Sequence, residues 1–274
     1  SVMDLQILLL IVAGLIGGFM AGLLGVGGGI IYIFIFPLYL QQQGIAPEQL
    51  VPVTIANSIV GICIASCTGV YSQIRLKRFS LKEVLLMGLP GTISSILIIT
   101  LIVYSDWYDK TWFNSVVIIL LLWLLYNTLK NANPGGKFIR ERTATTWGLG
   151  LTGLSAGSIA ALSGMGGGVL VIPVLNSGVR MNIKKAKSIS LGVISITSTA
   201  LTLFNLFKTV YLPKEIVHTG AVIWWLILPV IAGVVVSTPL GVRLSKKLPS
   251  YLIQYIFAVF VGIVIIRKAY ELLL

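Results

Sequence analysis

Apolar residues fill long uninterrupted stretches of this chain, and short polar loops separate them. Eight such stretches occur in the 274 residues, at 5–40, 50–72, 83–103, 112–129, 145–179, 188–207, 217–242 and 250–266. Six of them have the length of one transmembrane helix, about 17–25 residues. The stretches are apolar on every side instead of alternating, which favours helices over the strands of a membrane barrel. The pattern therefore predicts an all-α polytopic membrane protein.

The stretches 5–40 and 145–179 are too long for one crossing. They hold 36 and 35 residues, and a straight helix of that length would exceed about 50 Å in a bilayer core of about 30 Å. Each is interrupted by a glycine cluster, at Gly25–Gly29 and at Gly164–Gly168. Glycine weakens a helix and allows positive φ, so each stretch is predicted to be a helical hairpin that turns inside the membrane. The arm after the second cluster, 169–176, spans only about 12 Å, which places the tips near mid-depth.

The basic residues of the loops test this topology. If all eight stretches crossed the membrane once, Lys and Arg would divide 12 to 8 between the two sides. The basic loops of the first half would then lie on the opposite side from those of the second half. With two hairpins, one side holds 15 and the other holds 5, which satisfies the positive-inside rule in both halves. The larger group is Arg75, Lys77, Arg78, Lys82, Lys130, Lys137, Arg140, Arg142, Arg180, Lys184, Lys185, Lys187, Arg243, Lys246 and Lys247, and the smaller is Lys110, Lys208, Lys214, Arg267 and Lys268.

The hairpins make the second half of the chain an inverted copy of the first. Residues 1–131 are the predicted first repeat, with hairpin 5–40 and spans 50–72, 83–103 and 112–129. Residues 132–144 are a cytoplasmic connector, and 145–274 are the second repeat, with hairpin 145–179 and spans 188–207, 217–242 and 250–266. The glycine clusters recur at an offset of 139 residues. The expected architecture is two inverted repeats with both termini outside the cytoplasm, an arrangement typical of transporters with a site at the midplane.

Composition narrows the function. Hydrophobic residues make up 57% of the chain and charged residues 10%, with mean hydropathy +0.99 and net charge +12. A soluble domain is excluded, and positive-inside bias with anionic lipid explains the basic loops better than nucleic acid does. Every acidic residue lies in a loop or at a span end, so no carboxylate pair is available to hold a cation or relay protons. No catalytic residue set, metal site or cofactor site is predicted, which argues against an enzyme.

The candidate binding residues lie inside the membrane. Glycines at a helix start expose backbone N–H groups and the positive end of the helix dipole, which suits a small anion. Polar side chains on two spans at an offset of 132 residues would add hydrogen-bond donors. The candidates are Gly27, Gly28, Gly29, Asn57, Ser58, Gly166, Gly167, Gly168, Ser188 and Ser190, with Thr54, Ser195, Thr197 and Ser198 as weaker ones.

Structural explanations for the same residues remain open. The glycine clusters can serve tight packing alone, which is the favoured role of the small-residue ridges that precede them. The polar side chains can join helices by hydrogen bonds, each worth about 0.6 kcal/mol in a membrane. The ridges are Gly14, Gly18 and Gly22 in the first half, and Gly153, Gly157 and Ala161 in the second.

These motifs resemble the sulfite exporter TauE/SafE family over almost the whole chain. The resemblance is carried by the two glycine clusters and by Ala56-Asn57-Ser58 and Ser188-Ile189-Ser190. Pro239-Leu240-Gly241 with Arg243 is similar to the family's exit from its penultimate helix. The resemblance implies an exporter of sulfite, sulfoacetate or another organosulfonate, and we expect it in the cell (inner) membrane. The inverted repeats predict alternating access as its mechanism. An anion channel, or a membrane enzyme of sulfur metabolism, remains an alternative.

Overall fold

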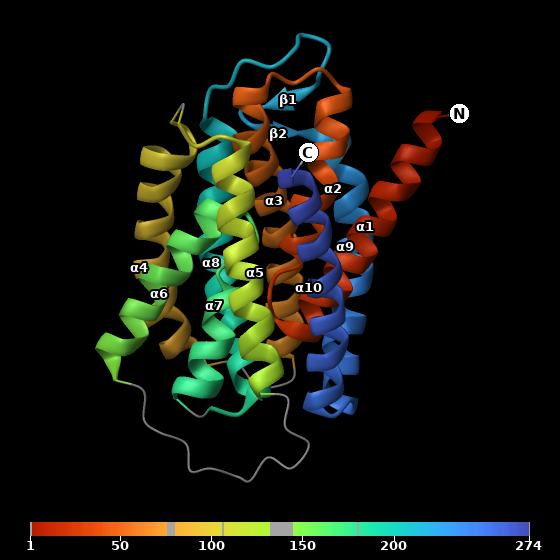
Figure 1. The fold of residues 1–274 in the computed structure, drawn as a ribbon. Coiled ribbons are helices and arrows are strands. Elements are labelled where there is room, and N and C mark those ends of the chain that lie inside the picture. Colours follow the sequence, from red (N-terminus) through yellow and green to blue (C-terminus); the bar gives the residue numbers. More distant parts are fainter. Residues whose placement is uncertain (1, 76–79, 106, 132–144, 180, 274) are drawn as a thin grey trace.

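A computed structural model describes residues 2–75, 80–105, 107–131, 145–179 and 181–273. These residues form a helical bundle with one very short pair of antiparallel strands (Figure 1). The helices are α1 Val2–Leu24, α2 Gly29–Gln42, α3 Pro47–Ile74, α4 Leu81–Ile98, α5 Lys110–Asn131, α6 Thr146–Ser163, α7 Gly168–Pro173, α8 Ile183–Phe207, α9 Trp224–Lys247 and α10 Ser250–Leu273. π-helical turns extend α4 through η1 Ile99–Val103 and α7 through η2 Val174–Gly178, and the strands are β1 His218–Thr219 and β2 Val222–Ile223.

Six of the described helices are long and apolar enough to cross a membrane: Asp4–Leu24, Pro47–Ile74, Leu81–Val103, Lys110–Asn127, Lys184–Phe207 and Trp224–Lys247. The outer surface of the bundle is apolar as well. On α4 and η1, residues Leu89, Ile93, Leu97 and Leu101 recur every four positions with exposures of 53–68%. Such a stripe suits lipid and not water. The prediction of an all-α polytopic membrane protein is confirmed.

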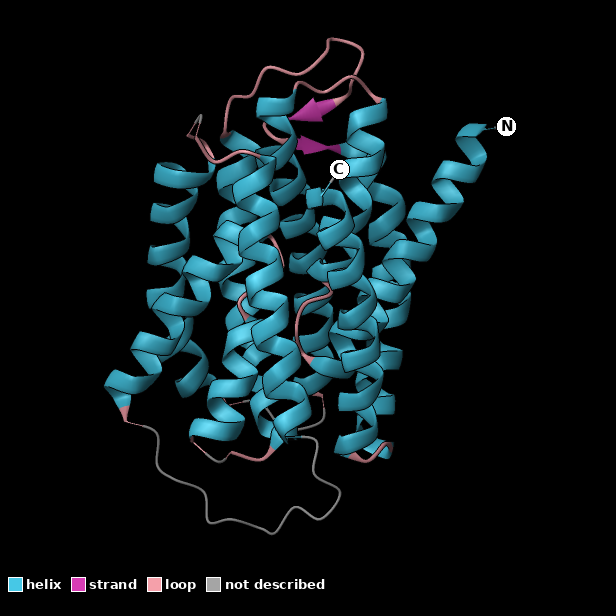
Figure 2. Ribbon diagram, in the orientation of Figure 1, coloured by secondary structure: helices cyan, strands magenta, loops and turns pink. Residues whose placement is uncertain are grey.

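Both long stretches are broken at their glycines. α1 ends at Leu24 and α2 begins at Gly29, while α6 ends at Ser163 and α7 begins at Gly168. The turns need glycine because Gly25 and Gly27 have φ of 78° and 90°, and the corresponding Gly164 and Gly166 have φ of 63° and 85°. Figure 2 shows these breaks as short loops inside the bundle.

The two ends of the bundle differ, and we name them by their contents. The strands β1 and β2 lie at the β end, where α1 begins, α2 ends and α10 ends (Figure 1). α5 ends and α6 begins at the opposite end, which we call the connector end. The first hairpin therefore opens toward the β end and the second toward the connector end. The connector 132–144 itself, together with Lys77, Arg78 and Arg180, lies outside the described residues.

Local signals fix several helix starts. Pro47 is the first residue of α3, where its missing N–H costs nothing. The Asp109 carboxylate accepts the N–H groups of Thr111 and Trp112 at 2.9 and 3.0 Å and caps α5. The Asn182 side chain accepts the Lys184 N–H at 2.9 Å, so α8 starts at Ile183, five residues before the predicted span 188–207.

One predicted span begins too early. The apolar stretch 217–242 was expected to be helical throughout, whereas α9 starts only at Trp224. His218–Ile223 instead forms the β1–β2 pair, with His218 opposite Ile223. Hydropathy does not distinguish this apolar strand pair from a helical turn, because contacts with distant residues stabilise it.

The small-residue ridges hold helices at close range. α1 packs along α9, and α6 packs along α4. A side chain at Gly14 would collide with the Val230 carbonyl, and one at Gly153 with the Met87 carbonyl. The packing role expected for these ridges is confirmed, since only small residues permit such approach between backbones. α3 lies at the centre of the bundle, largely buried and packed against α8.

Candidate functional site

The two glycine turns meet inside the bundle. A β-carbon built on Gly29 would lie 2.6 Å from the Gly164 carbonyl oxygen and 2.8 Å from the Met165 Cα. A β-carbon on Gly168 would lie 2.7 Å from the Gly25 carbonyl oxygen. The turns thus leave no room between them for even a methyl group, and the centre is closed in this conformation.

Two serine hydroxyls join these turns to the central helices. Ser58 on α3 donates to the Gly164 carbonyl at 2.6 Å, and Ser190 on α8 donates to the Gly25 carbonyl at 2.8 Å. Both serines are fully buried. Each bond runs from the central helix of one half of the chain to the glycine turn of the other half. We call this pair the crossed serine bonds.

The glycines of each cluster face two different ways. Gly27 and Gly166 approach Ile62 at the centre, with built β-carbons 3.0 and 3.5 Å from its Cγ2. In contrast, a side chain on Gly28 would collide with the Gly17 carbonyl of α1. Gly167 is similar, since its β-carbon would lie 2.8 Å from the Ala156 carbonyl oxygen of α6. Gly28 and Gly167 therefore pack against the first arm of their own hairpin.

Asn57 has a structural task. Its amide nitrogen donates to the carbonyls of Val53 at 2.8 Å and Ala221 at 3.0 Å, and its amide oxygen accepts the Ile223 N–H at 2.9 Å. Both of its N–H donors are thus engaged with backbone. These bonds hold the β1–β2 segment on α3. Ser188 is fully buried near the start of α8, two residues before Ser190.

Two lysines that contribute only loop charge in the sequence pattern lie beside helix ends at the connector end. Lys187 is 5% exposed and donates to the Leu23 carbonyl at the end of α1, 2.9 Å away. Lys184 donates to the Lys246 carbonyl in the last turn of α9 at 3.2 Å. Both ammonium groups suit the negative ends of these helices. A sign of this role in the sequence is that Lys187 lies three residues before Ser190, so both belong to one helical face. With Gln73 and Ser245 they line a cavity of about 10 Å³, room for about one water.

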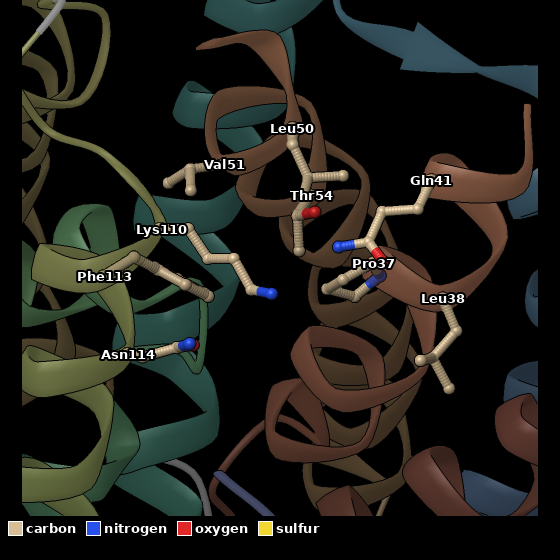
Figure 3. A pocket seen from close by; sticks show the side chains of 9 residues that line it. All are labelled: Pro37, Leu38, Gln41, Leu50, Val51, Thr54, Lys110, Phe113 and Asn114. Atoms are coloured by element: carbon tan, nitrogen blue, oxygen red, sulfur yellow. The ribbon is translucent and has the colours of Figure 1, made fainter. Parts of the chain in front are cut away.

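A larger cavity opens at the β end between α2, α3 and α5 (Figure 3). Its volume is about 100 Å³. Its polar lining is Gln41, Thr54, Lys110 and Asn114, and its apolar lining is Pro37, Leu38, Leu50, Val51 and Phe113. Thr54 lies one helical turn before Ser58 on α3, which separates these two lining and bonding residues by about 6 Å along the helix. In the sequence, Thr54 is only a weaker candidate, and Lys110 does not differ from the other lysines of the loops.

Comparison with known proteins identifies the family. The sequence profile described as "Sulfite exporter TauE/SafE" matches residues 10–268, nearly the whole chain. The chain belongs to the sulfite exporter TauE/SafE family. A "probable membrane transporter protein" of Methanocaldococcus jannaschii is 25% identical over 248 residues, which cover 89% of this chain and 88% of that protein. No solved structure matches.

The family match confirms the resemblance that the two glycine clusters and the motifs at 56–58 and 188–190 indicated. The six apolar helices agree with this assignment to a family of multi-pass membrane transporters. In this TauE/SafE chain the structure brings most of the predicted binding residues together at the centre: Gly27, Gly29, Ser58, Gly166, Gly168 and Ser190. Gly28, Gly167 and Asn57 contact backbone beside it.

Proposed function

We propose that this protein exports a small sulfur-containing anion, sulfite or an organosulfonate such as sulfoacetate, across the cell (inner) membrane. The family supports an anion of this class. The charge distribution supports the orientation, with the connector end in the cytoplasm and both termini outside. Among the described basic residues, Arg75, Lys82, Lys130, Lys185 and Lys247 belong to the connector end.

The two halves act as inverted repeats in this proposal. The crossed serine bonds are the observation that carries it, because exchanging the halves exchanges one bond for the other. The helix pairs agree, since α1 packs on α9 of the second half and α6 packs on α4 of the first. The two hairpins open toward opposite ends of the bundle (Figure 1). Opposed hairpins around a central contact are the arrangement that alternating access requires.

The transport step follows from the closed centre. When one half rocks against the other, the crossed serine bonds break, and the turns Gly27–Gly29 and Gly166–Gly168 separate. This movement frees the hydroxyls of Ser58 and Ser190 together with the first N–H groups of α2, which have no acceptor within the helix. These donors would bind the anion, with Ser188 and Asn57 beside them. Export is favourable without a coupling ion, because an anion leaving an inside-negative cell gains about 2.3 kcal/mol per charge per 100 mV.

Flux in proteoliposomes tests the function. Vesicles loaded with sulfoacetate, sulfite or sulfate should release at least one of them in a saturable manner, faster under an inside-negative potential. Unsaturable currents would instead indicate an anion channel, and conversion of the solute without movement would indicate an enzyme. Absence of release for all three anions would contradict the proposal.

A pair of serine variants tests the proposed site. Ser190→Ala removes one crossed serine bond and should lower flux about threefold, the effect of about 0.6 kcal/mol. Ser195→Ala is the matched control, because the Ser195 hydroxyl binds the Gly192 carbonyl of its own helix at 2.8 Å. Equal flux in the two variants would show that Ser190 is not part of the binding site.

A further inference from the structure

The cavity at the β end contains a hydroxyl that no residue in the described part of the chain binds. Thr54 is 1% exposed, and its Oγ1 has no hydrogen-bond partner among the described residues. Hydroxyls on membrane helices usually bind a carbonyl of their own helix, as Thr100 binds Ile96 at 2.7 Å. Three other buried hydroxyls of the described chain share this state, and of the four only Thr54 lines the cavity. A buried polar group is costly unless something binds it, so the cavity is shaped for a polar occupant.

The exposed side chains of Lys110 and Gln41 also line this cavity. Lys110 is the first residue of α5, where the helix dipole disfavours a cation. Figure 3 shows its ammonium and the Gln41 amide pointing into the cavity from opposite sides, near Thr54. The neighbouring Asp109 carboxylate caps α5. No ion pair to Lys110 is present among the described residues, and the cavity brings its ammonium together with the Thr54 hydroxyl and the Gln41 amide.

The rest of the lining is apolar. Leu38, Leu50, Val51 and Phe113 form its walls opposite and beside these polar groups. A bare inorganic oxyanion would satisfy the polar groups and leave this apolar surface unfilled. An anionic head group with a short hydrocarbon part would cover both. The volume of about 100 Å³ is several times the 10–15 Å³ that one water needs.

We propose that this cavity is a binding site for a small organic anion, a sulfonate or carboxylate with a short carbon chain. Lys110 and Gln41 bind its head group, Thr54 donates a hydrogen bond to it, and the apolar walls hold its carbon chain. The site deepens the proposed export function on which it rests, as the station that the substrate occupies after it passes the crossed serine bonds. It favours an organic anion over sulfite or sulfate.

Equilibrium binding to the purified full-length protein in nanodiscs tests the site. Calorimetry with propanesulfonate and with sulfate should show at least tenfold tighter binding of propanesulfonate. Lys110→Gln should weaken that binding about tenfold or more, since it removes a charge-assisted hydrogen bond. Lys110→Arg should retain most of it. Thr54→Val conserves shape and should weaken binding about threefold to tenfold, while Thr54→Ser should restore it.

Two controls match these variants. Lys208→Gln removes a lysine at the same end whose ammonium lies 4.6 Å from the Tyr104 ring centre, outside the cavity. Thr100→Val removes an exposed hydroxyl that binds its own helix. Both should bind propanesulfonate as the wild type does. Equal affinity for the two anions, no binding to the wild type, or unchanged binding in Lys110→Gln would overturn the site. If binding follows these expectations while proteoliposomes show no flux, the site stands and the export function fails.

Discussion

Gly168→Ala probes the contact between the two glycine turns. A methyl group at this position would lie 2.7 Å from the Gly25 carbonyl oxygen, 2.7 Å from the Ile194 Cδ1 and 2.8 Å from the Ser190 Oγ. Ile194 can change rotamer, but the Gly25 carbonyl is backbone and is held by Ser190. The variant therefore prevents the turns from closing, without straining the backbone of Gly168, whose φ is not positive.

The free-energy cost of this added methyl group can be estimated from substitutions that overpack protein cores. Extra methyl groups in a packed core destabilise it by about 1–3 kcal/mol. Here that cost falls on the closed centre, which the proposed alternating-access cycle passes through each time. If closure limits the rate, transport should slow about 5- to 150-fold. Gly29→Ala should act alike, because its methyl group would lie 2.6 Å from the Gly164 carbonyl oxygen.

Initial rates of sulfoacetate release from proteoliposomes measure this effect. Gly150→Ala is the control, since it adds the same methyl group to α6 where no atom lies within 4 Å. Thermal unfolding of each variant in detergent shows that the protein is folded. Wild-type rates in Gly168→Ala would refute the inference that the turns must close during transport.

Three further outcomes are expected. Asn57→Leu should lower the free energy of unfolding by about 1–3 kcal/mol, seen as a lower melting temperature, because it leaves the backbone groups of the β1–β2 segment unpaired; an unchanged melting temperature would exclude this role. In a cysteine-free background, Lys82→Cys and Lys185→Cys should both react with a membrane-impermeant thiol reagent only from the cytoplasm, and labelling of the two from opposite sides would contradict the inverted topology. Gly28→Val should reduce the yield of folded protein, because its side chain would collide with Gly17; a normal yield with lost flux would instead place Gly28 in the substrate site.

The sequence predicted the features that depend on composition and local pattern. Long apolar runs indicate membrane helices wherever they occur, and the glycine clusters mark breaks because positive φ at Gly25 and Gly164 excludes most other residues. The predicted start of α9 at residue 217 was wrong because it depends on contacts with distant residues. The segment 218–223 begins a long apolar stretch but is held as strands by Asn57, which is more than 160 residues away in the chain.

The candidate site was predictable in type but not in detail. Polar residues at Asn57, Ser58 and Ser190 stood out in the sequence, yet their partners are carbonyls of distant segments. Nothing in the pattern distinguishes Asn57, which holds a strand pair, from Ser58, which reaches the opposite turn. The outer cavity depends on α2, α3 and α5 coming together, so the meeting of Lys110 with Thr54 became visible only in three dimensions.

The crossed serine bonds also constrain what half of this chain could do alone. Neither half contains both the donor and the acceptor of either bond, since Ser58 needs Gly164 and Ser190 needs Gly25. A fragment that ended at Asn131 would contain the Ser58 hydroxyl without its acceptor and the Gly25 carbonyl without its donor. If the halves are inverted repeats as proposed, it could complete them only by pairing with a second fragment inserted upside down, so a single-repeat ancestor with this centre would have had to reside in the bilayer in both orientations.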